Sequence, residues 1–327
     1  PDQLARLLPR VNPALVVTNT RLAPKLPAGT PTLLIDRDVP AGTHSLQEFL
    51  ATPAPDLLAE RVSVVQPDDE CFYGCTSGST GDPKICVYTH FRMINPFIHL
   101  DHSTNIDASK RVSLCCAPLF TSAAHFQVDA IFCAGAKVII CDRFDPTEVF
   151  DIIAEEGVTN LNNAPSAILA IIRHPQFNYE KLKTVQHVTM GGAAVSDALI
   201  REATEKMHLK SCWNAYGMTE LCGLLIRMTV NLSVMAAHYE LRIVDHQTRQ
   251  TVQRGVPGEL EVRSPTMMRG YLNNDAANAA AFTKDGWFKT GDEGVMDEFG
   301  RVTITGRVKD IIIRGGHNVY PSEIVDV

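Results

Sequence analysis

The sequence lacks any long apolar run and any excess of positive charge. Its longest apolar stretches, such as KVIIC and DIIIR, are far shorter than the roughly 20 residues that a membrane-spanning helix needs. Basic residues number 30 against 37 acidic ones, which gives a formal net charge of −7. Because nucleic-acid binders carry a basic face, we expect neither a transmembrane segment nor a nucleic-acid partner.

The sequence also shows no signal peptide and no cysteine framework. It opens at Pro1 without a methionine, so any targeting segment would lie outside the printed sequence. The nine cysteines are odd in number and most stand beside apolar residues, which indicates buried, reduced thiols. Cys71 and Cys75 are four apart, but no second pair has zinc-finger spacing, so a structural role is favoured. We expect an intracellular protein, in the cytoplasm or in a peroxisome or mitochondrion.

The order of predicted elements indicates the fold class. With 327 residues, 45% of them hydrophobic, the chain can form two or three compact units. A helix at 2–11 and strands at 14–20 and 32–36 open the chain, and an alternation of strands and helices follows. The predicted strands are 111–118, 136–142, 158–165 and 184–192, and the predicted helices are 145–157, 166–175 and 196–207. This alternation predicts a largely parallel sheet covered by helices.

The pattern changes at about Val230, after which hairpin turns and strands follow without long helices. This change predicts a smaller, mostly antiparallel β subdomain. We therefore expect an α/β fold in three parts. They are an α/β part over 1–228, a β-rich subdomain over 229–308, and a hinge with the start of a further domain over 309–327.

One loop, YGCTSGSTGDPK at 73–84, has an unusual composition. Its hydroxyls and glycines let backbone N–H groups surround an oxyanion closely, and Lys84 adds a point charge for phosphate. It is not a Walker A loop, which needs GxxxxGK[ST], because Lys84 follows Asp82-Pro83 and precedes Ile85. A flexible connector is the alternative, but a connector seldom runs through Pro-Lys into a strand-like ICVYTH. The loop is therefore interpreted as a phosphate-binding loop.

This loop resembles the signature of the adenylate-forming, AMP-binding superfamily. That superfamily contains acyl-CoA synthetases, coumarate–CoA ligases, beetle luciferases and peptide-synthetase adenylation domains. Four more blocks follow in the family's order: MGGAAVS, NAYGMTE, GELEVRSPTMMRGYLNN and GWFKTGDEGVMDEFGRVTITGRVKDIIIRGGHNVYPSEI. The resemblance covers nearly the whole chain and implies the family's N-terminal domain, truncated at both ends.

The resemblance implies roles for individual residues. Thr219, Glu220 and Lys84 would be catalytic: Thr219 would bond the α-phosphate and Glu220 would hold Mg²⁺, for which a carboxylate is a suitable ligand. Tyr216 would stack on adenine, and the Asp292 carboxylate would accept hydrogen bonds from two ribose hydroxyls. Taken alone, Glu220 would be read as a surface charge and Asp292 as a turn residue.

The remaining implied roles concern the nucleotide and the second substrate. Arg307 would reach ribose and phosphate, Lys309 would mark the hinge, and Gly315 and Gly316 would line the passage for pantetheine. The residues expected to bind ATP or CoA are Thr76, Ser77, Gly78, Ser79, Thr80, Gly81, Lys84, Gly192, Ala193, Asn214, Ala215, Tyr216, Gly217, Met218, Thr219, Asp292, Arg307, Lys309, Gly315 and Gly316.

The implied reaction activates a carboxylic acid in two steps. The acid attacks the α-phosphate of ATP to give an acyl-adenylate and pyrophosphate, and the thiol of CoA then displaces AMP. The expected partners are thus a small-molecule carboxylic acid, ATP with Mg²⁺, and CoA. Positioning and charge neutralisation would supply most of the first step.

Four departures from the family pattern bear on activity. The chain stops at Val327, and the family's lysine block, PxxxxGKxxR, has no counterpart, so we expect weak or no adenylation by the chain as printed. The segment after Glu220 is short and lacks the GSVGRPxPG stretch. Ile85 replaces the usual glycine after Lys84, and Thr121 stands where the family's PLFHxxG block has histidine, with His125 four residues later.

The substrate class follows from the same region, and two alternatives stay open. Peptide-synthetase adenylation domains have an Asp after the aromatic residue to bind an α-ammonium group, whereas Phe120 is followed here by Thr121. The small, weakly polar segments LFTSAAHF, NNAPSA and MGGAA suit an aliphatic or simple aryl acid. The alternatives are a catalytically inactive nucleotide- or acyl-binding pseudoenzyme and a peptide-synthetase adenylation domain.

Overall fold

A computed structural model gives the structure of the chain. It describes residues 2–40, 42–52, 64–76, 83–102, 110–119, 121, 124–125, 128, 135–141, 143–229, 233–236, 238–310, 312–314 and 317–319. The chain divides into two compact units, Pro1–Asp69 with Ser77–Ile85, and Glu70–Thr76 with Cys86–Val327. In the described ranges no helix has both the length and the apolarity to cross a bilayer.

The first unit contains a small parallel sheet of order β1-β2-β3. Its elements are α1 (Asp2–Val11), β1 (Val16–Thr18), the 3-10 helix η1 (Ala23–Lys25), β2 (Thr32–Leu34), β3 (His44–Ser45) and α2 (Leu46–Ala51). The Ser45 side chain caps α2 by accepting from the Gln47 amide. The predicted opening helix and both strands are confirmed.

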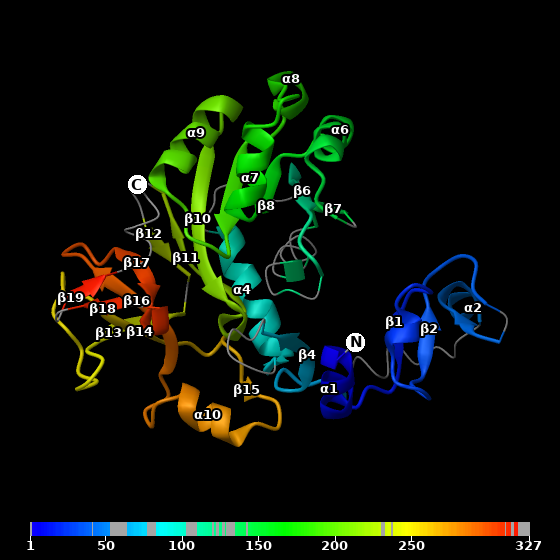
Figure 1. Cartoon of the computed structure of the whole chain (residues 1–327), viewed down its shortest axis with the longest axis horizontal. Coiled ribbons are helices and arrows are strands. Elements are labelled where there is room, and N and C mark those ends of the chain that lie inside the picture. The colour runs from blue at the N-terminus through cyan, green and yellow to red at the C-terminus, as the bar shows by residue number, and fades with distance from the viewer. Residues whose placement is uncertain are drawn as a thin grey trace. The chain divides into compact units, whose positions relative to one another are not determined.

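A seven-stranded sheet forms the centre of the second unit (Figure 1). Its order is β12 (Ser233–Met235), β11 (Gly223–Met228), β10 (Ser211–Met218), β9 (His187–Gly191), β8 (Asn160–Asn163), β6 (Val112–Cys115) and β7 (Lys137–Ile140). The five strands from β10 to β7 are parallel, and β11 and β12 are antiparallel to their neighbours. The predicted largely parallel sheet is confirmed.

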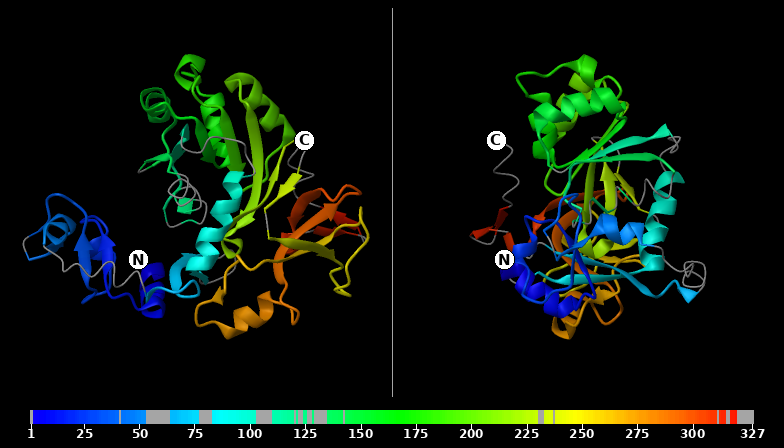
Figure 2. Two further views of the ribbon diagram at one scale, coloured as in Figure 1. Left: turned by 180° about the vertical axis from the view of Figure 1, so that it is seen from behind. Right: turned by 90° about the vertical axis from the view of Figure 1, so that its right-hand side faces the viewer.

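Four helices pack together on one face of this sheet (Figure 2). They are α6 (Pro146–Glu156), α7 (Pro165–Ile172), α8 (Tyr179–Leu182) and α9 (Asp197–Met207). The chain steps in one direction from β7 through β8 and β9 to β10, and right-handed crossovers then place all the connecting helices on the same side. The predicted N-cap of α6 is confirmed, since the Asp145 carboxylate accepts from the Thr147 amide, and α6 ends at Gly157.

The rest of the second unit is mostly antiparallel, as predicted. A four-stranded sheet contains β13 (Glu240–Val244), β14 (Gly258–Arg263), β16 (Phe288–Met296) and β17 (Val302–Arg307). A three-stranded sheet has the order β15 (Gly270–Tyr271), β5 (Ile85–Thr89) and β4 (Glu70–Cys75). The other elements are α4 (His90–His102), η3 (Thr219–Leu221), α10 (Asp275–Ala281), η4 (Val308–Asp310) and the pair β18 (Ile312–Arg314) and β19 (His317–Val319).

Two apolar cores hold the second unit together. Leu161 and Val188 of the seven-stranded sheet pack with Ile153 and Ile168 of the helices, and all four are fully buried. A second core joins the smaller sheets through residues such as Leu260. Burial of a side chain of this size contributes about 1.5–3 kcal/mol, so these cores dominate the stability.

The cysteines follow the expectation of reduced, mostly buried thiols. The eight described cysteines are free, and five of them are buried: Cys86, Cys115, Cys116, Cys212 and Cys222. Burial raises the pKa of the Cys212 thiol to about 11, which keeps it protonated. Cys71 is exposed and Cys75 is partly buried.

Candidate active site

The carboxyl ends of β9 and β10 form one wall of the candidate site. Gly191 ends β9 and lies opposite Ala215 of β10. A Cβ atom at Gly191 would come within 2.9 Å of the Ala215 carbonyl oxygen, so only glycine permits this close approach. The chain then exposes Gly192 and Ala193 at the edge where parallel strands of open α/β sheets commonly bind ligands.

Strand β10 continues past this edge and presents Tyr216. The pairing of β10 with β11 shifts between Tyr216 and Gly217, so Asn214 to Met218 form an irregular strand end. The Tyr216 hydroxyl donates to Asp292 Oδ2 at 2.6 Å, which joins the large sheet to β16. The two residues are 76 positions apart in the sequence, so only the tertiary fold brings them together.

Asp292 is held from both sides. It lies opposite Arg307 in the β16–β17 pairing, and Arg307 Nε is 3.3 Å from Asp292 Oδ1. Asp292 is buried, whereas about half of the Arg307 side chain is exposed. Each carboxylate oxygen of Asp292 therefore has a protein partner, and each retains a second lone pair for a ligand hydroxyl.

The pKa values around Asp292 reflect burial first. Burial and then the Asp292 charge raise the pKa of Tyr216 well above its usual value, so the phenol stays neutral and donates. Burial also raises the pKa of Asp292, although the bond from Tyr216 and the charge of Arg307 act to lower it and Glu259 acts to raise it. Arg307 and Tyr216 thus favour the charged form of a carboxylate that burial disfavours.

Thr219 and Glu220 follow β10 in the short helix η3. Glu220 is 9% exposed, and its Oε1 accepts from the Tyr271 hydroxyl at 2.9 Å. The Glu220 carbonyl accepts from the Met268 amide at 2.9 Å, which fixes the backbone as well. Glu220 is therefore a buried, oriented carboxylate rather than the surface charge that its position alone would indicate.

The strand that leads into the predicted phosphate-binding loop reaches the same place. A Cβ atom at Gly74 of β4 would lie 3.2 Å from the Thr219 methyl group, so β4 passes directly beside η3. Thr76 follows two residues later, in the same unit. The fold therefore brings the start of the loop, Thr219, Glu220, Tyr216 and Asp292 into one neighbourhood.

Several predicted residues lie elsewhere or outside the described part. Lys84 is exposed just before β5 and belongs to the first unit, so its catalytic role stays a prediction. Lys309 lies in η4, immediately after β17, with its neighbour Asp310 close enough to influence Asp292. The described residues do not include Ser77, Gly78, Ser79, Thr80, Gly81, Gly315 and Gly316.

Comparisons with known proteins identify the family. The family model described as AMP-binding enzyme matches residues 1–272. The chain belongs to the AMP-binding enzyme family. The putative acyl-CoA synthetase YngI of Bacillus subtilis is 34% identical over 287 residues, covering 85% of this chain and 52% of YngI. The acyl-CoA ligase sidI of Aspergillus fumigatus is 32% identical over 300 residues, covering 86% of this chain and 50% of sidI.

A solved structure with bound ATP has the same fold. ATP-bound MatB from Rhodopseudomonas palustris superposes with a TM-score of 0.82 at 25% identity, over 98% of this chain and 64% of MatB. The chain spans about half the length of the two curated relatives. The family resemblance and the α/β fold expected from the sequence are both confirmed.

One buried carboxylate could help to hold a magnesium ion together with a bound triphosphate. Within the described ranges no group of three His, Cys, Asp or Glu side chains could hold a metal ion by itself. Glu220 instead offers a single buried carboxylate, oriented by Tyr271. Mg²⁺ is commonly bound by one or two carboxylates together with substrate phosphates, and this donor set suits such an ion.

Sequence reasoning missed the residues that support the predicted site residues. Tyr271 orients Glu220, and Thr290 and Glu259 bond the backbone around Asp292. One signal was available: in GELEVR, Glu259 and Glu261 alternate with Leu260 and Val262. That alternation puts both glutamates on the face of the strand opposite the core.

Proposed function

We propose that this protein is part of an acid–CoA ligase, which converts a carboxylic acid to an acyl-adenylate with ATP and transfers the acyl group to CoA. The observation that carries the proposal is the joining of Tyr216, Asp292 and Arg307, next to Thr219 and Glu220, at one edge of the seven-stranded sheet. The names of YngI and sidI support the same class of reaction.

In this proposal the nucleotide lies along the strand ends. The ring of Tyr216 supports adenine, and Asp292 accepts from the ribose hydroxyls while Arg307 balances its charge. Thr219 donates to the α-phosphate. Lys84 and the loop at 76–81 are proposed as phosphate ligands on the sequence pattern alone. Mg²⁺ bound to the triphosphate would add charge neutralisation beside Glu220.

The acid is proposed to bind where the strand order reverses. The chain leaves β6 toward β7 and then returns past β6 to β8, so the point of reversal lies between β6 and β8. Open α/β sheets bind ligands outside the strand ends at such a point. The segments that follow β6, β8 and β9 are rich in small residues, which supports a fatty or simple aryl acid as the substrate.

The first test measures thermal unfolding with Mg-ATP and then with non-hydrolysable acyl-adenylate analogues of different acyl groups. A ligand that binds only the folded state at about 100 times its dissociation constant adds about 2.7 kcal/mol of stability. We expect a shift with ATP and a larger, acyl-dependent shift with the best analogue. The absence of any shift from a cooperatively unfolding protein would overturn the proposal and leave a protein with the family's fold but no working nucleotide site.

A pair of aspartate variants shows whether a shift comes from this site. Asp292→Ala should abolish most of the ATP-dependent shift, because it removes the ribose acceptor. The matched control is Asp151→Ala on α6, whose exposed side chain is paired only with Lys181 among the described contacts. Equal shifts in both variants would place ATP elsewhere.

A further inference from the structure

We propose that Glu259 is a positioning residue for Asp292, and that Arg249 is its counter-charge. The proposal rests on the proposed function, because it treats Asp292 as the residue that accepts hydrogen bonds from the ribose hydroxyls. It assigns a task to a buried carboxylate on β14 whose described contact with this region is the backbone of Gly291, the residue before Asp292.

The evidence begins with an irregular pairing of β14 and β16. Glu259 lies opposite Glu293 and Glu261 lies opposite Lys289. Leu260 alone therefore faces three residues of β16, Thr290 to Asp292. Such a bulge bends the strand and turns its side chains to a new direction, and here the turned residue is Asp292.

A bulge leaves backbone amides without their partners in the sheet, and two side chains replace them. Thr290 Oγ1 accepts from the Asp292 amide at 3.1 Å and itself donates to the Leu260 carbonyl at 2.9 Å. Glu259 Oε1 accepts from the Gly291 amide at 3.3 Å. Gly291 has φ +72°, a conformation that a residue with a side chain adopts only under strain. Glu259 thus holds the residue immediately before Asp292 in its left-handed conformation.

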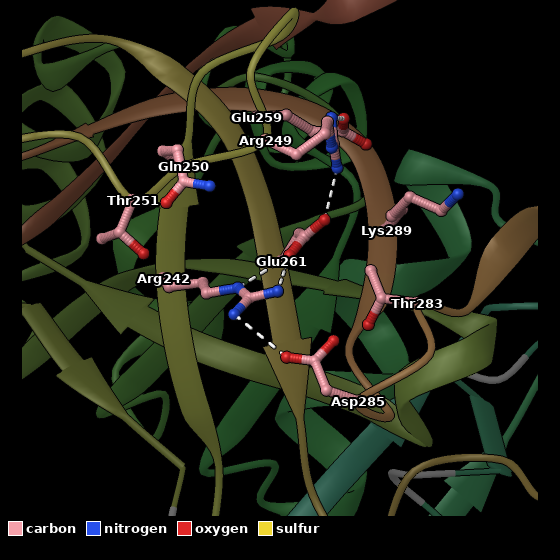
Figure 3. A pocket seen from close by; sticks show the side chains of 9 residues that line it. All are labelled: Arg242, Arg249, Gln250, Thr251, Glu259, Glu261, Thr283, Asp285 and Lys289. Carbon is pink, nitrogen blue, oxygen red and sulfur yellow. Dashed lines mark hydrogen bonds and ion pairs between the residues drawn. The ribbon is translucent and has the colours of Figure 1, made fainter.

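Arg249 compensates the negative charge of the buried Glu259 carboxylate. Glu259 is buried and lies opposite the second buried carboxylate, Glu293. Arg249 Nη1 donates to Glu259 Oε2 at 2.5 Å, and its other terminal nitrogen binds Glu261 (Figure 3). The charge of Glu259 raises the pKa of Asp292, and the Arg249 guanidinium offsets part of that charge.

The strand offers a matched control. Glu261 lies two residues from Glu259 on the same face of β14, is buried, and also binds Arg249. Its carboxylate binds Arg242 as well, at 2.7 Å, but among the described hydrogen bonds none joins this carboxylate to a backbone amide of β16 (Figure 3). Replacing either glutamate by methionine removes a buried carboxylate of similar size, but only one replacement removes the acceptor for Gly291.

The test measures the affinity of the purified protein for ATP, 2′-deoxy-ATP and 3′-deoxy-ATP by calorimetry. The unmodified protein should prefer ATP, and Asp292→Ala should lose that preference. Glu259→Met should reduce the preference for ATP by about tenfold, the ratio expected for one charge-assisted hydrogen bond. Glu261→Met should retain the preference, and Glu259→Gln should retain most of it, because the amide oxygen still accepts from Gly291.

The outcomes separate this proposal from the proposed function. A protein that binds ATP without regard to its ribose hydroxyls would overturn both. Ribose preference that depends on Asp292 but is unchanged in Glu259→Met would overturn only the positioning role, as would an equal loss in Glu261→Met. If Glu259→Met does not fold, hydrogen exchange of the Gly291 amide in the unmodified protein is measured instead. Exchange as fast as that of an unprotected amide would overturn the proposal.

Discussion

The seven-stranded and the four-stranded sheet use their faces differently. Helices α6 to α9 cover one face of the larger sheet with fully apolar side chains such as Ile153 and Ile168. The four-stranded sheet buries Leu260 and Val262 on one face in the same way. Its other face carries charged side chains that pair with one another instead of being covered by helices.

The charged face is organised around carboxylates. Glu261 is bound by both Arg242 and Arg249, and Glu293 lies 3.1 Å from His246 Nε2. Arg242 and Arg263 also approach the ring of Trp287, with guanidinium carbons 4.3 and 4.8 Å from its centre. Antiparallel sheets can leave one face to polar groups, whereas helix-covered parallel sheets bury theirs.

The difference bears on the site, because each sheet supplies a different kind of residue. The helix-covered sheet contributes a shaped edge, with Gly191 packed against Ala215 and Tyr216 beyond it. The four-stranded sheet contributes the charged pair of Asp292 and Arg307. Apolar packing determines the shape of the site, and the paired charges determine its electrostatics.

The largest expected loss of stability comes from the apolar face, which both sheets have. Leu161→Ala in β8 and Leu260→Ala in β14 each empty a fully buried leucine site, so each should cost about 3 kcal/mol of unfolding free energy. Urea unfolding of the two variants measures this cost. A clearly smaller loss for Leu260→Ala would mean that the core of the four-stranded sheet is less well packed.

A smaller loss of stability is expected from the charged face of the four-stranded sheet. Arg249→Met removes the guanidinium shared by Glu259 and Glu261 and should cost about 2 kcal/mol, because the two buried carboxylates lose a partner and Arg249 is itself partly exposed. The matched control is Arg173→Met, which removes an exposed pair with Glu202 on the helices of the large sheet. Isolated surface pairs contribute little, so its unfolding transition should hardly move.

These two substitutions can contradict the comparison directly. If Arg249→Met is as mild as Arg173→Met in urea unfolding at the same ionic strength, the charges on the four-stranded sheet do not act as a buried network. Raising the salt concentration should only slightly reduce the difference in unfolding free energy between Arg249→Met and Arg173→Met, since buried pairs are screened less than exposed ones.

The smallest effect concerns pH and the large sheet. Burial first, and then Arg111 and Lys210, lower the pKa of His187, which lies opposite Ser211 in the β9–β10 pairing. In the unfolded chain His187 has the pKa of an unperturbed histidine, about 6.5, and therefore binds a proton at a higher pH than in the folded protein. Stability contributed by neutral His187 should fall as the pH drops below that value.

His187→Asn should flatten this dependence. Its unfolding free energy should decrease less between neutral and mildly acidic pH than that of the unmodified protein, as urea unfolding at a series of pH values would measure. Identical slopes in the two proteins would show that His187 does not contribute to the acid sensitivity of the sheet.

Much of the fold could be predicted because its signals are local. Asp145 and Gly157 bracket a helix whose ends depend on residues within a few positions, and the structure has both ends as predicted. The candidate site was harder to predict from the sequence. Glu220 looks like a surface charge until Tyr271, 51 positions away, is seen to bind it. Glu259 gains its importance only from its contact with Gly291, 32 positions later.

The family, the alternation of strands and helices, and the residue types of the candidate site could all be inferred from the sequence. These follow from short patterns and from hydrophobic periodicity, which act over a few residues. Which of those residues meet could be seen only in the folded chain, because strand register and a bulge in β16 bring Asp292 to Tyr216 and Arg307. Register depends on the packing of whole sheets, and no short segment of the chain contains that information.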